Sequence, residues 1–258
     1  MNVRRRLDVA ITRRRLAESR EAARRLIEEG RVTVEGQTAD KPARMVLDSD
    51  TIVVTGPPGE DFASRGAHKL IGALAAFEPL GLAPPEGRRS LDAGASTGGF
   101  TDVLLRRGAE HVIAVDVGYG QLVWRLQSDP RVTVVDRTNI RYLTADDLPY
   151  RPDLVVADLS FISLRLVLPA LVGVAAADAD LVLMVKPQFE VGRERLGKGG
   201  VVRDPVLWDE AVSGVSATAA GLGWIERAQA RSPLPGPAGN VEFFLWLQFV
   251  ADEQLAEA

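Results

Sequence analysis

The pattern of apolar and polar positions separates a long C-terminal part, in which short apolar runs alternate with amphipathic stretches, from a different N-terminal part. The apolar runs predict seven strands, at residues 91–93, 112–115, 132–135, 154–157, 181–185, 224–228 and 241–249. Helical spacing lies between most of them, at residues 100–107, 121–127, 164–177 and 205–221. This alternation predicts an α/β fold with a doubly wound sheet. A proline-rich turn alone separates the last two runs, so we expect those strands to pair antiparallel.

The N-terminal part predicts a small separate domain. Helical spacing covers residues 7–16 and 19–30, with Ser19 as a suitable N-cap and Gly30 just past the second helix. Short strand-like runs at 32–34 and 51–54 follow, so we expect an α+β unit of about 55 residues. The segment 56–59, Gly-Pro-Pro-Gly, can continue neither a strand nor a helix. We therefore expect domains at residues 1–59 and 64–258 joined by a linker at residues 60–63.

Composition excludes several kinds of chemistry. The chain has no cysteine and two histidines, so disulfides, zinc–cysteine sites and thiolate nucleophiles are excluded and a histidine-rich metal centre is not expected. It also has no uncharged apolar run long enough to span a membrane, and no apolar stretch behind its basic start that would indicate a signal peptide. We expect a cytoplasmic, monomeric protein that uses no metal and no membrane.

Charge is distributed unevenly. The net charge is -4, yet the first 25 residues carry nine arginines and three acidic residues, a local charge of +6. A basic end on a mildly acidic chain favours a polyanionic partner such as a nucleic acid, although a solvated helix face would give the same charge cluster.

A glycine-rich turn follows the first strand of the large domain. It has the spacing D-x-G-x-x-x-G-G, from Asp92 to Gly99, and favours S-adenosylmethionine over the tighter G-x-G-x-x-G of dinucleotide sites. The next two strands end in Asp116, suited to ribose hydroxyls, and Asp136, suited to an adenine amine. Aspartate is also a common turn residue at strand ends, so this reading has an ordinary alternative. We expect Trp124, nearby, to pack in the core, and the alternative is that it lines the cofactor pocket or stacks on a base.

The N-terminal domain resembles the S4-like RNA-binding domain through Arg6-Leu7-Asp8, Ser19-Arg20-Glu21-Ala22, Gly30-Arg31-Val32 and Lys41-Pro42. This resemblance implies that the basic helix faces contact RNA backbone. The implied RNA-binding residues are Arg6, Arg13, Arg14, Arg20, Arg24 and Arg31, with Arg65 as a further candidate beside the large domain's site.

Six ordered motifs spread over nearly the whole chain resemble the TlyA family. They are Ser64-Arg65-Gly66-Ala67-His68-Lys69, Asp92-Ala93-Gly94-Ala95-Ser96-Thr97-Gly98-Gly99-Phe100, Val115-Asp116-Val117-Gly118, Asp158-Leu159-Ser160-Phe161, Val185-Lys186-Pro187-Gln188-Phe189-Glu190 and Gly239-Asn240-Val241-Glu242. The family, long called hemolysins, consists of ribosomal-RNA ribose 2′-O-methyltransferases with an FtsJ-like domain. The resemblance implies a Rossmann-like seven-stranded methyltransferase sheet and transfer of methyl from S-adenosylmethionine to a cytidine 2′-oxygen, in 23S rRNA with 16S rRNA as a second candidate target. Its implied cofactor-binding residues are Asp92, Gly94, Ser96, Thr97, Gly98, Gly99, Phe100, Asp116, Val117, Asp136 and Asp158.

The same resemblance implies a catalytic tetrad of Lys69, Asp158, Lys186 and Glu242. A ribose hydroxyl is a weak acid, and a lysine can take its proton only if burial or a nearby cation lowers the lysine pKa. Lys186 ends a wholly apolar strand and precedes a proline, so we assign it as the base. We expect Asp158 and Glu242 to orient it, and Lys69 to hold the substrate and provide the second cation.

Three alternatives stay open. The chain could be a ribosome-assembly factor that binds RNA without methylating it, a nicotinamide dehydrogenase, or a hemolysin-type pore-former. The glycine spacing disfavours the dehydrogenase, and the lack of an apolar or amphipathic membrane segment disfavours the pore-former. Residues 158–161 read Asp-Leu-Ser-Phe rather than the Asp/Asn-Pro-Pro-Tyr/Phe of amine methyltransferases, and pyrimidine-carbon methylation needs a cysteine, so oxygen is the expected acceptor.

Overall fold

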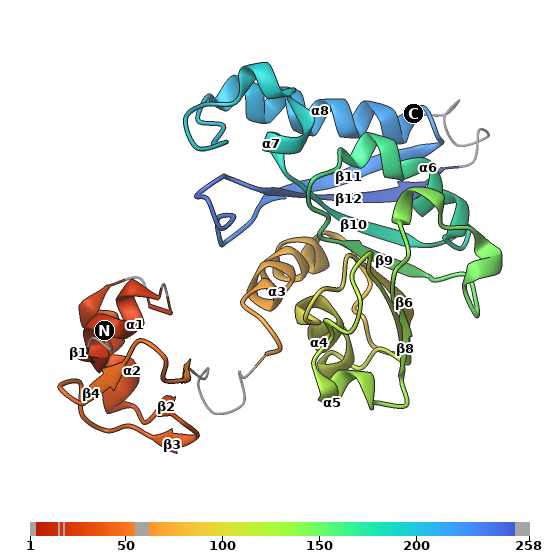
Figure 1. Ribbon diagram of the computed structural model, residues 1–258. Coiled ribbons are helices and arrows are strands. Elements are labelled where there is room, and N and C mark those ends of the chain that lie inside the picture. Colours follow the sequence, from red (N-terminus) through yellow and green to blue (C-terminus); the bar gives the residue numbers. More distant parts are fainter. Residues whose placement is uncertain (1–3, 15, 18, 55–61, 251–258) are drawn as a thin grey trace. The chain divides into compact units, whose positions relative to one another are not determined.

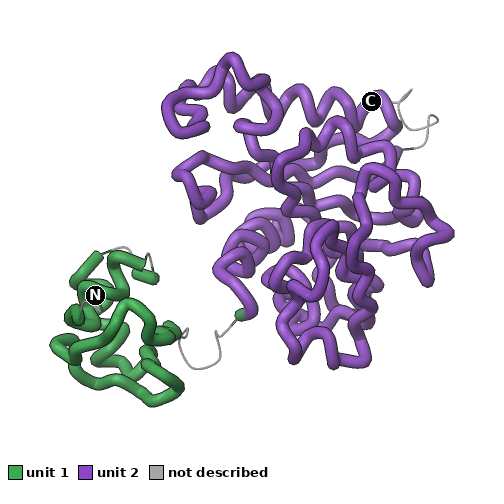
Figure 2. Tube along the Cα trace, viewed as in Figure 1, with its two compact units in different colours: residues 1–62 green, residues 63–258 purple. Residues whose placement is uncertain are grey.

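The computed structural model describes residues 4–14, 16–17, 19–54 and 62–250. The chain forms two compact units, Met1–Phe62 and Ala63–Ala258, which are shown in different colours in Figure 2. Their boundary falls within the segment expected to be the linker. Residues 55–61, which include the Gly-Pro-Pro-Gly break and the first half of that linker, lie outside the described part of the chain.

The N-terminal unit is a small α+β domain. Its elements are β1 (Arg4–Arg6), α1 (Leu7–Arg13), α2 (Arg20–Glu28), β2 (Val32–Val34), β3 (Gln37–Thr38), β4 (Met45–Leu47) and β5 (Ile52–Val54). The strands pair as β1–β4 and β3–β2–β5. The predicted caps of the second helix are confirmed: Ser19 Oγ accepts the Ala22 amide at 3.0 Å, and Gly30 adopts a φ of 70°. Leu7, Ile11 and Ile27 are fully buried in its core.

The C-terminal unit contains thirteen helices and strands among its described residues. They are α3 (Gly66–Phe77), β6 (Arg89–Ala93), α4 (Gly99–Arg106), β7 (His111–Val115), α5 (Trp124–Gln127), β8 (Val132–Val135), β9 (Leu154–Ala157), α6 (Leu164–Val174), β10 (Asp180–Val185), α7 (Pro187–Glu190), α8 (Pro205–Ala220), β11 (Trp224–Arg231) and β12 (Phe243–Phe249). Short 3-10 turns lie at Glu78–Leu80, Ile140–Tyr142, Ala145–Asp147 and Arg193–Arg195. All seven predicted strands are present.

The seven strands form one sheet in the order β11-β12-β10-β9-β6-β7-β8 (Figure 1). Strands β8, β7, β6, β9 and β10 are parallel, and β12 pairs antiparallel with both β10 and β11. The predicted reversed strand is therefore confirmed. The chain begins the sheet at its centre with β6 and continues first to β7 and β8 and then to β9 and β10, so the strand order reverses beside β6. Open sheets bind ligands at the carboxyl ends of the strands at such a point.

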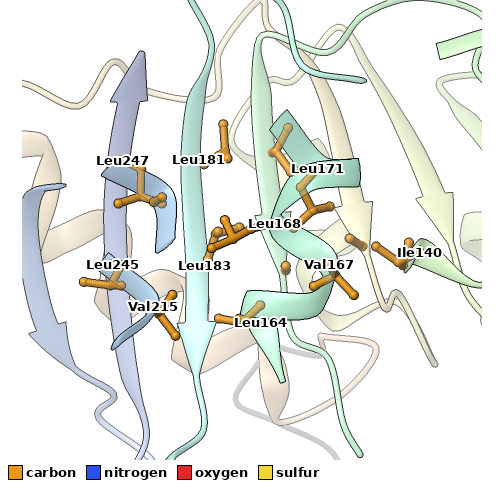
Figure 3. Close-up of a cluster of buried hydrophobic side chains, with 14 of the residues drawn as sticks. Ile140, Leu164, Val167, Leu168, Leu171, Leu181, Leu183, Val215, Leu245 and Leu247 are labelled. Atoms are coloured by element: carbon orange, nitrogen blue, oxygen red, sulfur yellow. The ribbon is translucent and has the colours of Figure 1, made fainter. Parts of the chain in front are cut away.

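Helices cover both faces of the sheet. On one face, leucines and valines of α6 and α8 pack on Leu181, Leu183, Leu245 and Leu247 (Figure 3). On the other, Phe77 of α3 lies 6.2 Å from Trp246 and Phe100 of α4 lies 6.2 Å from Phe244, between ring centroids. Strands buried on both sides need no alternation of polar residues, which explains their continuous apolar runs.

Two sequence expectations are wrong in the segment after β7. The helix expected over residues 121–127 is a single turn, α5, and Trp124 is 77% exposed instead of buried in the core. The turn packs inward through Leu126, which is 2% exposed, and this leaves the indole two positions earlier outside. Side chains two positions apart on a helix point in nearly opposite directions, so a turn that buries Leu126 leaves Trp124 facing away from the core.

Candidate active site

Two lysine–carboxylate pairs meet at the carboxyl ends of β9 and β10. Asp158 directly follows β9 and Lys186 directly follows β10, and these strands are parallel neighbours with Leu183 opposite Ala157. Lys186 Nζ lies 2.5 Å from Asp158 Oδ1 and donates a hydrogen bond to Ser160 Oγ at 2.9 Å. Lys186 is only 7% exposed, so its charge is balanced inside the protein rather than by bulk water.

The second pair joins Lys69 on α3 to Glu242, just before β12. Lys69 Nζ donates to Glu242 Oε2 at 2.5 Å, and both residues are buried. The expected contact between Glu242 and Lys186 is therefore replaced by a contact with Lys69. The reason is that α3 packs on one face of the sheet, with Phe77 beside Trp246 of β12, and brings its own lysine to the carboxylate that precedes β12. Lys69 Nζ also lies 3.8 Å from Met184 Sδ, on the strand that leads to Lys186.

A cavity of about 300 Å³ unites three members of the expected tetrad. Its lining includes Lys69, Asp158 and Lys186 together with Ser160. The glycine-rich turn forms another part of its wall, and Arg65 lines it as well. Because both lysines face one space, the two ion pairs can act on one bound group.

A larger cavity of about 510 Å³ adjoins the first and shares several of its lining residues. The shared residues are Gly94, Ser96, Asp158 and Ser160. Asp116 and Val117 line the larger cavity, as do Thr138 and Asn139 after β8. Together the two cavities extend from the lysines to the residues that follow β7 and β8.

The glycine-rich turn has the shape that its sequence predicts. Gly94 has a φ of 89°, and a Cβ there would lie 2.9 Å from the Asp158 carbonyl oxygen, so only glycine fits. Gly98 has a φ of 99°, and a Cβ there would collide with the Leu126 side chain. The turn then leads directly into α4, and Gly99 and Phe100 in the first turn of that helix line the smaller cavity.

Asp116 is held where its carboxylate can accept further hydrogen bonds. Its Oδ2 accepts the Ser96 amide at 2.8 Å and its Oδ1 accepts the Gly118 amide at 2.7 Å. Each carboxylate oxygen has a second lone pair, so both remain available to two adjacent hydroxyls in the larger cavity. This geometry fits the predicted role of Asp116 toward a ribose.

Asp92 and Asp136, also expected as cofactor-binding residues, line neither cavity. Asp92 is fully buried, and its Oδ2 accepts both the amide and the hydroxyl of Thr101, at 2.8 and 2.7 Å. Burial raises the pKa of Asp92 to about 7, against the lowering effect of those hydrogen bonds. Asp136 accepts the Gly120 amide at 2.8 Å. Both carboxylates hold the backbone around the site, and Gly98 likewise shapes the turn without lining a cavity.

Several lining residues were missed by the sequence reasoning. They are Ser64, Gly66, Ala95, Gln121, Thr138, Asn139, Ile140, Leu159, Ser160, Phe161, Ile162, Val167 and Pro237. Most of them follow a strand-end aspartate within a few positions, and six of them stand inside the motifs shared with the TlyA family; both signals could have identified them. Phe161 is notable because it is 91% exposed and has a φ of 65°. Its ring lies 5.4 Å from that of Phe189.

The arginines of the N-terminal unit differ in what they contact. Asp8 is fully buried and accepts hydrogen bonds from Arg6 and Arg20, with Arg24 Nε at 3.6 Å. Burial raises the Asp8 pKa, but the bonds from these guanidinium groups outweigh that effect and lower it. Arg6 is partly buried and Arg20 and Arg24 are exposed, and all three gather around one carboxylate, which holds them as a cluster.

The remaining arginines are placed differently. Arg14 donates to the carbonyl oxygens of Leu47, Asp48 and Asp50, so its guanidinium joins the helix to the β4–β5 turn. Arg13 is exposed, and Arg31 pairs with Glu29 at 3.0 Å.

Comparison with known proteins identifies both units. Residues 62–249 match the FtsJ-like methyltransferase family and residues 5–52 match the S4 domain. The 16S/23S rRNA (cytidine-2′-O)-methyltransferase TlyA of Mycobacterium tuberculosis is 56% identical over 97% of this chain and 92% of its own length. Hemolysin A of Brachyspira hyodysenteriae is 34% identical over 92% of this chain and 97% of its own.

A solved structure described as a hemolysin from Streptococcus thermophilus has a TM-score of 0.75 and 38% identity, covering 97% of this chain and 90% of that one. Within the described residues, the structure contains no helix with the length and apolar character needed to cross a membrane. The matches span both units and nearly the whole length of each relative. The chain therefore belongs to the TlyA family of FtsJ-like methyltransferases that carry an N-terminal S4 domain.

Proposed function

We propose that this protein transfers the methyl group of S-adenosylmethionine to the ribose 2′-oxygen of a cytidine in ribosomal RNA. The observation that carries the proposal is the pair of buried lysine–carboxylate contacts, Lys186 with Asp158 and Lys69 with Glu242, at one cavity beside the glycine-rich turn. The M. tuberculosis relative is named for this activity on 16S and 23S rRNA. We take residues 1–59 as the RNA-binding domain, 60–63 as the linker and 64–258 as the methyltransferase domain.

The site residues fit the cofactor chemically. Asp116 can accept the ribose hydroxyls in the larger cavity, and Thr138 and Asn139 add polar groups at its far end. The backbone from Gly94 to Gly99 can lie close to the bound cofactor, because Gly94 and Gly99 line the smaller cavity and carry no side chain. When bound, the cofactor provides an electrophilic methyl group on a sulfonium. Asp158 and Ser160, which line both cavities, then lie between cofactor and substrate.

Lys186 is the residue that takes the 2′ proton. In its neutral form the amine has one lone pair, and the nearby Asp158 carboxylate stabilises the positive charge that appears as the proton arrives. The O2′–H bond breaks, a new N–H bond forms on Nζ, and the ribose oxygen bonds to the methyl carbon as the methyl–sulfur bond electrons remain on sulfur. Lys69, fixed by Glu242, places a second positive charge at the same cavity to attract the forming alkoxide.

The S4 unit supplies sequence-independent attraction to RNA. The cluster around Asp8, formed by Arg6, Arg20 and Arg24, together with exposed Arg13, presents guanidinium groups suited to phosphates. Arg14 is better explained as a structural residue because its donors are directed at main-chain carbonyls.

The test is methylation of isolated ribosomal subunits. The protein is incubated with 30S and 50S subunits from cells that lack this activity and with methyl-labelled S-adenosylmethionine, and the rRNA is digested to nucleosides. We expect label in 2′-O-methylcytidine, lost in the Lys186→Ala variant although that variant still binds the cofactor by calorimetry. Label in another nucleoside, or cofactor and RNA binding without any incorporation, would reject the proposal and favour a binding-only factor.

A further inference from the structure

Ser160 makes a contact that the tetrad does not explain. It lies two residues after Asp158, in the loop between β9 and α6, and lines both cavities. Its Oγ accepts the hydrogen bond from Lys186 Nζ at 2.9 Å. The serine therefore touches the nitrogen that, under the proposed function, takes the substrate proton.

The two oxygens beside Nζ act on it differently. Asp158 Oδ1 is close, at 2.5 Å, yet it is buried without a hydrogen-bond partner among the described residues. Its contact with Lys186 is thus an ion pair lacking hydrogen-bond alignment. Charge attraction depends on distance and hardly on angle, whereas a hydrogen bond is strongly directional. Asp158 can balance the charge, and Ser160 is the group that can fix direction.

The loop that carries Ser160 is anchored on both sides. At its start, the Asp158 amide donates to the Ala93 carbonyl at 3.2 Å. At its end, Ser163 Oγ donates to Glu190 Oε2 at 2.6 Å and the Leu164 amide donates to Glu190 Oε1 at 2.7 Å. A hydroxyl on such a fixed loop has a defined position, which is what orienting a flexible lysine requires.

We propose that Ser160 is a positioning residue that directs Lys186 Nζ toward the substrate hydroxyl; this inference rests on the proposed function. A neutral amine has two N–H bonds and one lone pair. With its N–H groups facing Ser160 and Asp158, the lone pair is left for the cavity. Without the serine hydroxyl, Nζ keeps its ion pair with Asp158 but is free to rotate. The lone pair then points at the 2′ hydroxyl of bound RNA for a smaller share of the time.

The position of Ser160 separates this role from a purely structural one. Its side chain is exposed in the site and is not part of the buried core. Removing its hydroxyl should therefore leave folding and cofactor affinity unchanged. Only the turnover step should respond.

The test compares Ser160→Ala, Ser160→Cys and Ser160→Thr with the unchanged chain, on ribosomal subunits. Ser160→Cys keeps the size but has a weak acceptor, Ser160→Thr keeps the hydroxyl, and Ser213→Ala on the exposed side of α8 is the matched control. We expect Ser160→Ala and Ser160→Cys to lower kcat by about tenfold to a hundredfold, with KM for RNA and cofactor Kd unchanged. Ser160→Thr should recover most of kcat, and Ser213→Ala should match the unchanged chain.

The split between kcat and KM and the rescue by Ser160→Thr distinguish a positioning role from a structural one. The proposal is overturned if kcat of Ser160→Ala equals or exceeds that of the unchanged chain. It is also overturned if Ser160→Thr loses as much kcat as Ser160→Ala. If the unchanged chain makes no 2′-O-methylcytidine at all, the proposed function fails and this inference falls with it. If the unchanged chain and Ser160→Ala both make 2′-O-methylcytidine at the same rate, the inference about Ser160 fails and the proposed function stands.

Discussion

Glu190 caps the helix that begins at Leu164: its Oε1 accepts the Leu164 amide at 2.7 Å. Its Oε2 accepts the Ser163 hydroxyl at 2.6 Å and lies 3.3 Å from Arg165 Nε. Glu190 ends α7, which starts directly after Lys186, and Ser163 ends the loop that starts at Asp158. One buried carboxylate thus joins the two segments that carry the Lys186–Asp158 pair.

We expect Glu190→Ala to lower both stability and turnover. It leaves the buried Leu164 amide and the Ser163 hydroxyl without their acceptor, which costs about 1–3 kcal/mol of unfolding free energy, and it releases the loop beside Lys186. Urea unfolding and kcat on ribosomal subunits check this. Glu194→Ala, at an exposed position four residues later, is the control. An unchanged midpoint together with unchanged kcat would contradict the bracing role.

Replacing Lys186 by arginine should abolish turnover although the positive charge is kept. A guanidinium stays protonated at any usable pH, so it can pair with Asp158 but cannot accept the 2′ proton. We expect kcat to fall by about 10²–10⁴-fold. Methyl incorporation into subunits and cofactor binding by calorimetry are the measurements. Retention of near-normal kcat in Lys186→Arg would mean that the lysine acts only through its charge.

The stability of the protein should depend on pH through Asp92. Its folded-state pKa, raised by burial to about 7, is above the unfolded value, so the folded state holds the proton more tightly. The contribution of Asp92 to the unfolding free energy is fully present below about pH 4. It is lost as pH rises from about 4 to about 7, which lowers the unfolding free energy by about 4 kcal/mol. Above pH 7 it changes no further.

Asp92→Asn isolates this effect. The amide oxygen can still accept from the Thr101 amide and hydroxyl, but the side chain no longer titrates. We expect the difference in unfolding free energy between variant and unchanged chain to grow in favour of the variant from pH 4 to pH 7, measured by urea unfolding. A difference that stays constant over this range would show that Asp92 is ionised in the folded state.

Arg13 and Arg14, adjacent in sequence, should behave differently when each is changed to alanine. Exposed Arg13 is placed to meet a phosphate. Its loss should therefore make the fall of log K for RNA with log salt concentration less steep, by about 1 in the magnitude of the slope. Arg14 donates to three main-chain carbonyls, so its loss should lower the melting temperature and leave the slope unchanged. Salt titrations of RNA binding and thermal unfolding check the pair. Equal slopes for the two variants would contradict the assignment.

The sequence by itself determined the strands of the large sheet and the turn chemistry. Apolar runs identified all seven strands, and the glycine spacing identified the turn whose positive φ at Gly94 and Gly98 the structure contains. Ser19 and Gly30 marked the ends of α2 in the same way. Each of these features depends on neighbours within a few residues, because periodicity and backbone conformation are local properties.

Only the tertiary structure decided which side chains meet. The pairing of Lys69 with Glu242, 173 residues apart, depends on where α3, a helix that the apolar pattern did not predict, packs across the sheet. The burial of Asp92, the exposure of Trp124 and the contact of Ser160 with Lys186 have the same origin. Motifs indicated which charged residues belong to the site, but the partner of each charge follows from long-range packing, which no local pattern encodes.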